Sequence, residues 1–251
     1  MTGTEWKLKP SDIEAKSFSI IDAEAGAHDW DPRSWQLVRR LIHTSADFDY
    51  VKDTVISPGA IEAGIQALND GSIVLTDTNM ALSGINLRRL GNFGNTMACL
   101  VDDIRVINLA TKTGMTRSMA AVDVGFSTIS HQGQPEGAIW VFGNAPTGLF
   151  RLLERVKNDP SLPTPRLVVG LPVGFVNALE SKKALIDSGL PYFITNRGRK
   201  GGSNVAAATI NALSALAREE CSLAQTPGTS GSANGPSSPG SPKEPGEGGD
   251  S

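Results

Sequence analysis

The sequence predicts an α/β fold with a mainly parallel sheet, folded as a single domain. Two patterns indicate this class: short runs of apolar residues that lack polar alternation, and longer helical patterns that lie between these runs. Apolar runs of about four residues are typical of strands that are covered on both faces, as in a parallel sheet. The predicted strands are residues 73–76, 104–107, 139–142, 167–169 and 192–195.

Helical patterns precede and separate these predicted strands. The apolar spacing from Trp35 to Ile42 predicts an amphipathic helix that ends near His43. Residues 77–80 and 84–86 are predicted as a loop and a turn after the first strand. The other predicted helices are residues 57–69, 116–127, 147–158, 176–188 and 203–219. Ligands of such folds bind at the carboxyl ends of the strands, so candidate binding residues are expected in the loops that follow the strands.

Composition separates residues 1–225, the predicted folded domain, from a tail of residues 226–251. The tail is mostly Gly, Pro and Ser and has no aromatic residue, so it cannot bury enough apolar surface to offset its ordering entropy. We therefore expect the tail to be disordered. It carries part of the formal net charge of −3, which leaves the domain close to neutral. A neutral domain argues against nucleic acid as a partner.

The chain has two cysteines, Cys99 and Cys221, which imply no disulfide framework and favour a reducing compartment. The most apolar helical stretch, residues 205–217, is too short and too polar to span a membrane. The N-terminus lacks the basic and then apolar pattern of a signal peptide. The sequence thus predicts a cytoplasmic protein that is neither exported nor inserted in a membrane.

The end of the first amphipathic helix places a titratable imidazole beside two cations. Arg39 and Arg40 lie four and three residues before His43, so the three side chains share one ridge of the helix. Two guanidiniums disfavour a charged imidazole until an anionic ligand offsets them, after which the imidazole can hold and deliver a proton. The pattern predicts acid chemistry on a polycarboxylate. The alternative is an ordinary surface helix with a His packed at its edge.

Two loops bring glycines to the carboxyl ends of predicted strands. The turn Gly143–Thr147 predicts a close backbone approach and a free helix N-terminus that attracts an anion, with Asn144 at its start. A plain connecting turn capped by Asn144 is the alternative. The loop of residues 170–174 follows the next strand and leads into a helix that carries Lys182, although ordinary tight turns use the same Gly and Pro residues.

The loop Asn196–Ser203 is the strongest predicted anion site. It brings together three glycines, the start of a helix and the cations Arg197, Arg199 and Lys200. Its spacing matches neither common phosphate-binding motif, and a solvated basic turn is the alternative. Arg117 lies in the first turn of another helix, where the dipole gives a cation no benefit, so it is expected to have an external partner or to point into water.

Taken in their order along the chain, these segments resemble the precorrin-8X methylmutase family, also called cobalt-precorrin-8 methylmutase, of corrin-ring biosynthesis. Each motif is short, but their joint order from Ile13 to Ala217 is specific. The matching stretches are Ser17–Ile21, Val38–His43 with Ala46–Asp47, Gly143–Thr147, Gly170–Val176 with Glu180–Lys182, and Arg197–Ser203.

The resemblance implies a three-layer α/β/α fold, a homodimer and a tetrapyrrole substrate that lies near the subunit interface. It implies an isomerase of cobalamin biosynthesis that moves a methyl group from ring carbon 11 to ring carbon 12. The substrate would be precorrin-8X, giving hydrogenobyrinate, or cobalt-precorrin-8, giving cobyrinate. No external cofactor is expected. No metal site is expected either, because the three histidines share no ligand spacing.

The resemblance also assigns roles to residues. It implies that His43 is the acid that protonates the ring system, that Ser17 and Arg40 are pocket groups, and that Arg117 is a carboxylate clamp from the second subunit. Asn86 lies where some members of the family carry Thr. From the residues alone, Lys182, Arg197, Arg199 and Lys200 are candidates for contacts with peripheral carboxylates or for loop structure. Arg39 of the helical ridge and Asn144 of the glycine turn are further candidate substrate-binding residues.

Three other interpretations stay open at this point. A nucleotide-using α/β enzyme would hold phosphate on the 199–203 loop and would bind ATP or NAD. A noncatalytic corrinoid carrier would use the same pocket, with His43 orienting the ligand rather than protonating it. A scaffold protein that acts through its tail is the poorest alternative, because the tail lacks aromatic or charged interaction motifs.

Overall fold

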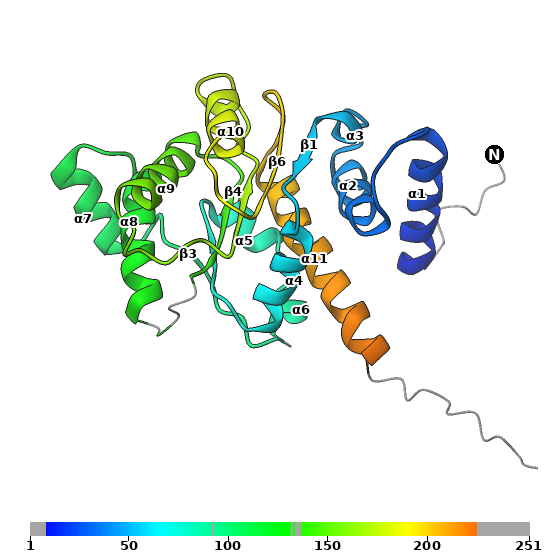
Figure 1. The fold of residues 1–251 in the computed structure, drawn as a ribbon, viewed down its shortest axis with the longest axis horizontal. Coiled ribbons are helices and arrows are strands. Elements are labelled where there is room, and N and C mark those ends of the chain that lie inside the picture. Colours follow the sequence, from blue (N-terminus) through cyan, green and yellow to red (C-terminus); the bar gives the residue numbers. More distant parts are fainter. Residues whose placement is uncertain (1–8, 92, 132, 134–136, 225–251) are drawn as a thin grey trace, which may run out of the picture.

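The computed structural model describes residues 9–91, 93–131, 133 and 137–224, and the predicted tail lies outside these residues. Its sheet has six strands in the order β1-β6-β5-β4-β2-β3 (Figure 1). β1 is antiparallel to β6 and the other neighbours are parallel, so the mainly parallel sheet is confirmed. The strands are β1 (Thr54–Ile56), β2 (Val74–Thr76), β3 (Met97–Cys99), β4 (Ile139–Phe142), β5 (Leu167–Gly170) and β6 (Phe193–Asn196).

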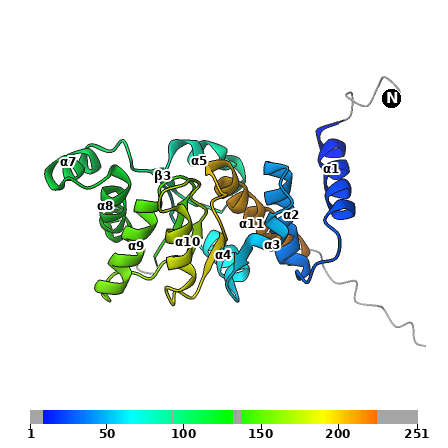
Figure 2. The ribbon, with the colours of Figure 1, turned by 90° about the horizontal axis from the view of Figure 1, so that it is seen from above.

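Helices lie on both faces of this sheet, as a view from above also shows (Figure 2). The described helices are α1 (Pro10–Glu24), α2 (Pro32–Ser45), α3 (Tyr50–Asp53), α4 (Ala60–Asn69), α5 (Asn79–Gly84), α6 (Leu87–Gly91), α7 (Ile104–Thr113), α8 (Arg117–His131), α9 (Pro146–Asn158), α10 (Ala178–Ile186) and α11 (Ser203–Ala224).

Two apolar cores explain why the central strands lack polar alternation. Successive strand residues point to opposite faces, so Ile139 and Val141 of β4 belong to one core while Trp140 and Phe142 belong to the other. The first core includes residues of α2, α4 and α11, and the second includes residues of α8, α9 and α10. The arrangement is a three-layer α/β/α fold, which confirms the expectation from the resemblance.

One predicted strand is wrong. Residues 104–107 form the start of α7, because the carboxylate of Asp103 accepts a hydrogen bond from the backbone N–H of Arg105 and caps a helix there. Val106 is fully buried against α8, whereas Ile104 is 64% exposed. The apolar run therefore belongs to a helix that buries one side only.

Strands β1 and β3 and helices α1, α3, α5 and α6 were not predicted from the sequence. β1 and β3 have three residues each and lie at the two edges of the sheet, where partial burial leaves a weak apolar signal. The predicted loop after β2 contains α5, which begins where the hydroxyl of Thr78 accepts a hydrogen bond from the backbone N–H of Ala81. Short elements of this kind depend on their neighbours more than on local pattern.

α1 and α7 lie at opposite ends of the molecule (Figure 1). α1 packs against α2, which in turn packs along α11. The carboxyl ends of β4, β5 and β6 lead into the loops that the sequence singled out. Within the described residues, no helix has the length and apolar character that crossing a membrane requires.

Candidate functional site

His43 lies in the last turn of α2 and makes a hydrogen bond with Ser17 of α1. The Ser17 hydroxyl and His43 Nδ1 are 2.8 Å apart, and the ring of Phe18 lies 5.2 Å from the imidazole, measured between centroids. A contact at Nδ1 leaves Nε2 as the ring nitrogen that can exchange a proton with a ligand.

α2 is a well-defined platform for this imidazole. Asp31 caps its first turn by accepting hydrogen bonds from the backbone N–H groups of Arg33 and Ser34, and Pro32 takes the first helical position. The helix ends at Ser45, and Ala46, which caps it, adopts a left-handed conformation with φ 55°. The sequence prediction of a helix that ends near His43 is confirmed.

The two arginines beside His43 already have carboxylate partners on α1. Arg39 forms an ion pair of 2.9 Å with Asp22, and Arg40 forms a short ion pair with Glu14. Both guanidiniums lie over the ring of Phe18, at 4.4 and 4.7 Å from its centroid. The positive charge beside His43 is thus partly offset before any ligand binds, which sequence reasoning did not anticipate.

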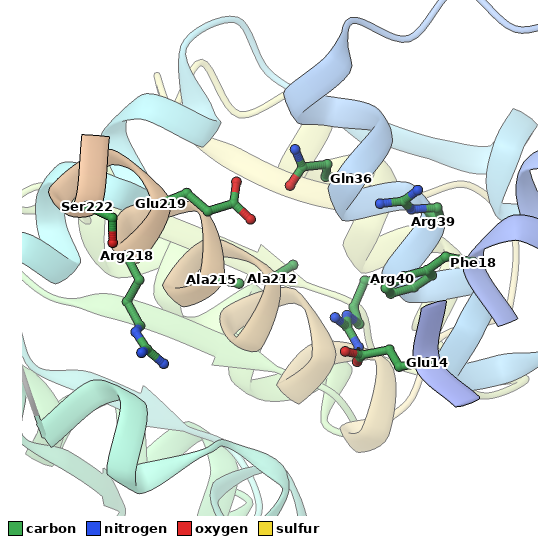
Figure 3. Close-up of a pocket in the computed structure, with 10 residues that line it drawn as sticks. All are labelled: Glu14, Phe18, Gln36, Arg39, Arg40, Ala212, Ala215, Arg218, Glu219 and Ser222. Carbon is green, nitrogen blue, oxygen red and sulfur yellow. The ribbon is translucent and has the colours of Figure 1, made fainter. Parts of the chain in front are cut away.

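An open cavity of about 660 Å³ lies next to these arginines, between α1, α2 and α11 (Figure 3). Its volume is in the range of small-molecule sites. Ala212 and Ala215 of α11 form an apolar wall, and Arg39 and Arg40 of α2 line the cavity beside it. The remaining lining residues are Glu14, Phe18, Gln36, Arg218, Glu219 and Ser222. An apolar wall with cations beside it suits a ligand that has an apolar body and carboxylate substituents.

The turn after β4 is not a free helix N-terminus, so that prediction is wrong. The carboxylate of Asp77, which follows β2, accepts hydrogen bonds from the backbone N–H groups of Gly143, Asn144 and Ala145 at 3.0, 2.7 and 2.7 Å. Burial raises the pKa of Asp77, and these three hydrogen bonds oppose part of that effect. The anion that the turn attracts is therefore a side chain of the protein itself. The Asn144 side chain is exposed.

Ion pairs of Lys200 hold the loop after β6 in position. Lys200 forms an ion pair of 2.6 Å with Asp47 and a shorter one with Asp49, and these hydrogen bonds raise the pKa of Lys200. Asp47 lies four residues after His43, so the ion pairs connect the loop to the end of α2. The buried side chain of Asn196 donates hydrogen bonds to the carbonyl oxygens of Arg197 and Lys200.

Lys182 lies beneath this loop rather than at the surface. Its side chain is 1% exposed, and its ammonium donates hydrogen bonds to the side-chain oxygen of Asn196, at 3.1 Å, and to the carbonyl oxygen of Lys200. The sequence left two roles open for Lys182, contact with peripheral carboxylates of a ligand and support of the loop. The contacts favour loop structure.

Lys182 should make stability depend on pH. Burial lowers its pKa to about 8 in the folded protein from 10.5, and the charge of Asp53 opposes part of that effect. Between these two values the unfolded chain binds more protons than the folded one, so the contribution of Lys182 to the free energy of unfolding rises as pH rises through this window. Urea denaturation from pH 7.5 to about 10.5 should show this rise in the wild type. In Lys182→Met the rise should be smaller, and an equal rise in both proteins would contradict the assignment.

The other candidate residues lie in separate places. Arg197 and Arg199 are exposed on the loop after β6, and the guanidinium of Arg199 lies 5.5 Å from the ring centroid of Phe175. Asn86 is exposed between α5 and α6, and its backbone N–H donates to the side chain of Asn211 at 2.8 Å. Arg117 begins α8, toward the end of the molecule opposite α1 and α2 (Figure 1), and pairs with Asp102 at 3.1 Å. The structure therefore brings Ser17, Arg39, Arg40 and His43 together, and Lys182, Arg197, Arg199 and Lys200 together.

Sequence reasoning missed Asp77, Phe18 and the role of the acidic residues after α2. The position of Asp77 directly after a buried strand was a usable signal, because carboxyl ends of parallel strands meet at one edge. Among the described residues, no three His, Cys, Asp or Glu side chains gather as a metal site.

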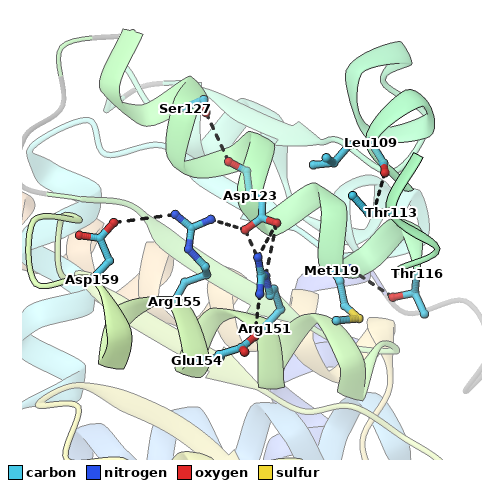
Figure 4. A network of polar contacts seen from close by, with 10 residues as sticks. All are labelled: Leu109, Thr113, Thr116, Met119, Asp123, Ser127, Arg151, Glu154, Arg155 and Asp159. Atoms are coloured by element: carbon cyan, nitrogen blue, oxygen red, sulfur yellow. Dashed lines mark hydrogen bonds and ion pairs between the residues drawn. The ribbon is translucent and has the colours of Figure 1, made fainter. Parts of the chain in front are cut away.

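A cluster of ion pairs joins α8 to α9 (Figure 4). Asp123 of α8, whose side chain is 13% exposed, accepts hydrogen bonds from Arg151 and Arg155 of α9. Glu154 pairs with Arg151 at 2.7 Å and is 53% exposed. The cluster fixes two helices of the same layer.

Replacing Asp123 with Ala should lower the free energy of unfolding by about 2–3 kcal/mol, because two guanidiniums then lose their shared partner. Glu154→Ala is the matched control. It should cost about 1 kcal/mol or less, since its carboxylate is mostly in water. Urea denaturation of both variants measures the difference, and equal losses would show that Asp123 has no special role between the helices.

Comparison with known proteins adds an independent finding. The family model of precorrin-8X methylmutase matches residues 12–216. The chain is 45% identical over 210 residues to the cobalt-precorrin-8 methylmutase of Salmonella typhimurium, covering 82% of this chain and 94% of that protein. It is 42% identical over 203 residues to the precorrin-8X methylmutase of Pseudomonas aeruginosa, covering 80% and 93%. The crystal structure of a precorrin-8X methylmutase from Thermus thermophilus matches with a TM-score of 0.73 and 41% identity, covering 83% and 98%.

The α/β/α fold and these matches define an enzyme of the isomerase class, a methylmutase of cobalamin biosynthesis. The chain belongs to the precorrin-8X methylmutase family. The resemblance seen in the ordered motifs is confirmed, and the alternative of a nucleotide-using enzyme gains no support.

Proposed function

We propose that this enzyme moves a methyl group from carbon 11 to carbon 12 of a precorrin-8 macrocycle, with His43 as the general acid. The observation that carries the proposal is the imidazole of His43, held by Ser17 at 2.8 Å and flanked by two arginines, in a chain of this family. Relatives named for the metal-free and for the cobalt-containing substrate are similarly close to this chain. Both precorrin-8X, giving hydrogenobyrinate, and cobalt-precorrin-8, giving cobyrinate, are therefore candidate substrates.

The proposed reaction requires protonation of the ring system and involves no oxidation or reduction of the substrate. The bond between carbon 11 and the methyl group breaks as the bond to carbon 12 forms, so the migration is intramolecular and neither oxidises nor reduces the substrate. Protonation of the ring system selects the tautomer in which the migration is favourable. The Nε2 atom of His43 would supply that proton, and Ser17 would keep the imidazole in place through Nδ1.

Substrate binding is proposed to rest on the cations around this imidazole. The peripheral acetates and propionates of the macrocycle would bind Arg39 and Arg40, in exchange for or in addition to their contacts with Asp22 and Glu14. The exposed cations Arg197 and Arg199 would bind further carboxylates. Asn86 and Asn144, both exposed, stay proposed polar contacts, while Lys182 and Lys200 would act by holding the loop.

We further propose that the enzyme works as a homodimer in the cytoplasm, with the site near the subunit interface. Arg117 is the first residue of α8, which lies toward the end of the molecule opposite α1 and α2 (Figure 1), so we propose that Arg117 binds the substrate of a second subunit. In that dimer the substrate carboxylate would compete with Asp102 for the Arg117 guanidinium. Sedimentation of the purified protein, with and without tetrapyrrole, tests the assembly.

The test of the function is anaerobic incubation of the purified enzyme with metal-free precorrin-8X and, separately, with cobalt-precorrin-8. Conversion is followed by the visible absorption spectrum, and the product is identified by mass and by its spectrum. Appearance of the hydrogenobyrinate or cobyrinate chromophore supports the proposal and selects the substrate. Binding without conversion of either compound would favour the carrier interpretation, and absence of binding would overturn the proposal.

A further inference from the structure

The loop between β5 and α10 carries the most exposed large apolar side chains of the described residues. Phe175 is 85% exposed and Val176 is 77% exposed. They lie side by side at the carboxyl end of a central strand of the sheet. Contiguous exposed apolar side chains, in contrast to single ones, mark surfaces that bind a ligand or a partner.

Backbone hydrogen bonds hold this loop against the loop after β6. The aromatic ring is therefore exposed on a segment of defined position. The backbone N–H of Gly174 donates to the carbonyl oxygen of Arg199 at 3.2 Å, and the N–H of Gly202 donates to that of Leu171 at 2.9 Å. Gly201 has φ +151°, and a Cβ atom there would lie 2.2 Å from the Leu171 oxygen. The two loops therefore form one unit that is already ordered before a ligand binds. Binding then costs little conformational entropy in these loops.

The surroundings of Phe175 are cationic. The guanidinium of Arg199 lies 5.5 Å from the Phe175 ring centroid, which is a cation–π distance, and Arg197 is exposed on the same loop. Lys200, the residue before Gly201, forms an ion pair with Asp47 and so joins this unit to the segment that follows α2, the helix that carries His43. An apolar centre with cations beside it complements a flat apolar ring that has carboxylates on its rim.

We propose that Phe175 and Val176 form a subsite for the flat face of the tetrapyrrole macrocycle, and that Arg199 binds a carboxylate on the rim of the same ring. This inference rests on the proposed substrate class and adds a specificity-determining residue to it. The position of the loop agrees with the general rule that ligands of parallel sheets bind beyond the carboxyl ends of the strands. Arg199 then has two roles, because it both flanks the aromatic ring and pairs with the ligand.

The test compares Phe175→Ala, Phe175→Tyr and a control, Ile104→Ala, which removes a side chain of 64% exposure at the start of α7. Tetrapyrrole binding is measured by absorption titration and turnover by steady-state kinetics. Phe175→Ala should raise Kd and KM by about 2- to 10-fold, the usual size of a stacking contact, and the effect should fall on KM rather than kcat. Phe175→Tyr should restore wild-type values because it keeps the aromatic face, and Ile104→Ala should leave both constants unchanged.

Two results would overturn the subsite. One is a wild-type Kd and KM in Phe175→Ala. The other is a change from dimer to monomer in Phe175→Ala, seen by light scattering, with an unchanged Kd for tetrapyrrole, which would show that a second copy of the chain covers Phe175. Failure of the proposed reaction is distinguishable from both, because the Kd comparison decides the subsite even if wild type binds the ligand without converting it.

Discussion

His43→Gln is expected to lower turnover by about 10²- to 10⁴-fold while the variant still binds the tetrapyrrole. Glutamine can keep a hydrogen bond to Ser17, at the place where the hydroxyl now lies 2.8 Å from Nδ1, but it cannot deliver a proton. The expected loss is the usual contribution of general acid catalysis. Single-turnover absorption measurements, with Kd determined separately, separate the chemical step from binding.

Ser17→Ala is the matched variant for this experiment. It removes the hydroxyl partner and keeps the imidazole, so it should lose much less turnover than His43→Gln. A folded His43→Gln protein with wild-type kcat would remove His43 from the mechanism. A variant that no longer binds tetrapyrrole would show that His43 holds the ligand and would leave its role as an acid without support.

Asp77→Ala should cause the largest loss of stability among the single substitutions considered, about 3–5 kcal/mol in the free energy of unfolding. The buried carboxylate accepts three backbone hydrogen bonds from the turn after β4, and its removal leaves three N–H groups without their partner. Each such buried donor costs about 1–3 kcal/mol, and some relaxation of the turn should reduce the total. Guanidinium denaturation followed by far-UV circular dichroism measures the loss.

Asp31→Ala provides the comparison. Asp31 also accepts two backbone hydrogen bonds, from Arg33 and Ser34 at the start of α2, but it is exposed. Water can replace the carboxylate there, so the loss should be clearly smaller than for Asp77→Ala. Equal losses in the two variants would mean that burial of Asp77 adds nothing to its role as a cap.

The comparison of α2 with α7 shows where sequence patterns succeed. α2 has an apolar stripe over fourteen residues and a capping Asp with Pro after it, so periodicity and end signals agree. The run at residues 104–107 is too short for periodicity to separate a strand from one turn of a helix, and the capping carboxylate of Asp103 decided for α7.

The candidate site shows the same division. The sequence indicated His43, Arg39 and Arg40 as one ridge, because helical spacing is local information. It could not indicate Glu14 and Asp22 as the partners of those arginines. These acidic residues lie on α1, 17 or more residues away in the sequence, and reach the arginines only because α1 packs against α2. The charge that surrounds His43 is therefore a tertiary property.

The sequence by itself determined the α/β class, the central strands, most of the long helices and the family. These follow from patterns within a few residues and from the order of motifs along the chain. The tertiary structure alone decided which charges meet: Asp77 fills the turn after β4, Lys182 lies beneath the loop after β6, and Lys200 connects that loop to Asp47. The physical reason is that burial and ion pairing depend on distances between residues far apart in the chain, which no local pattern encodes.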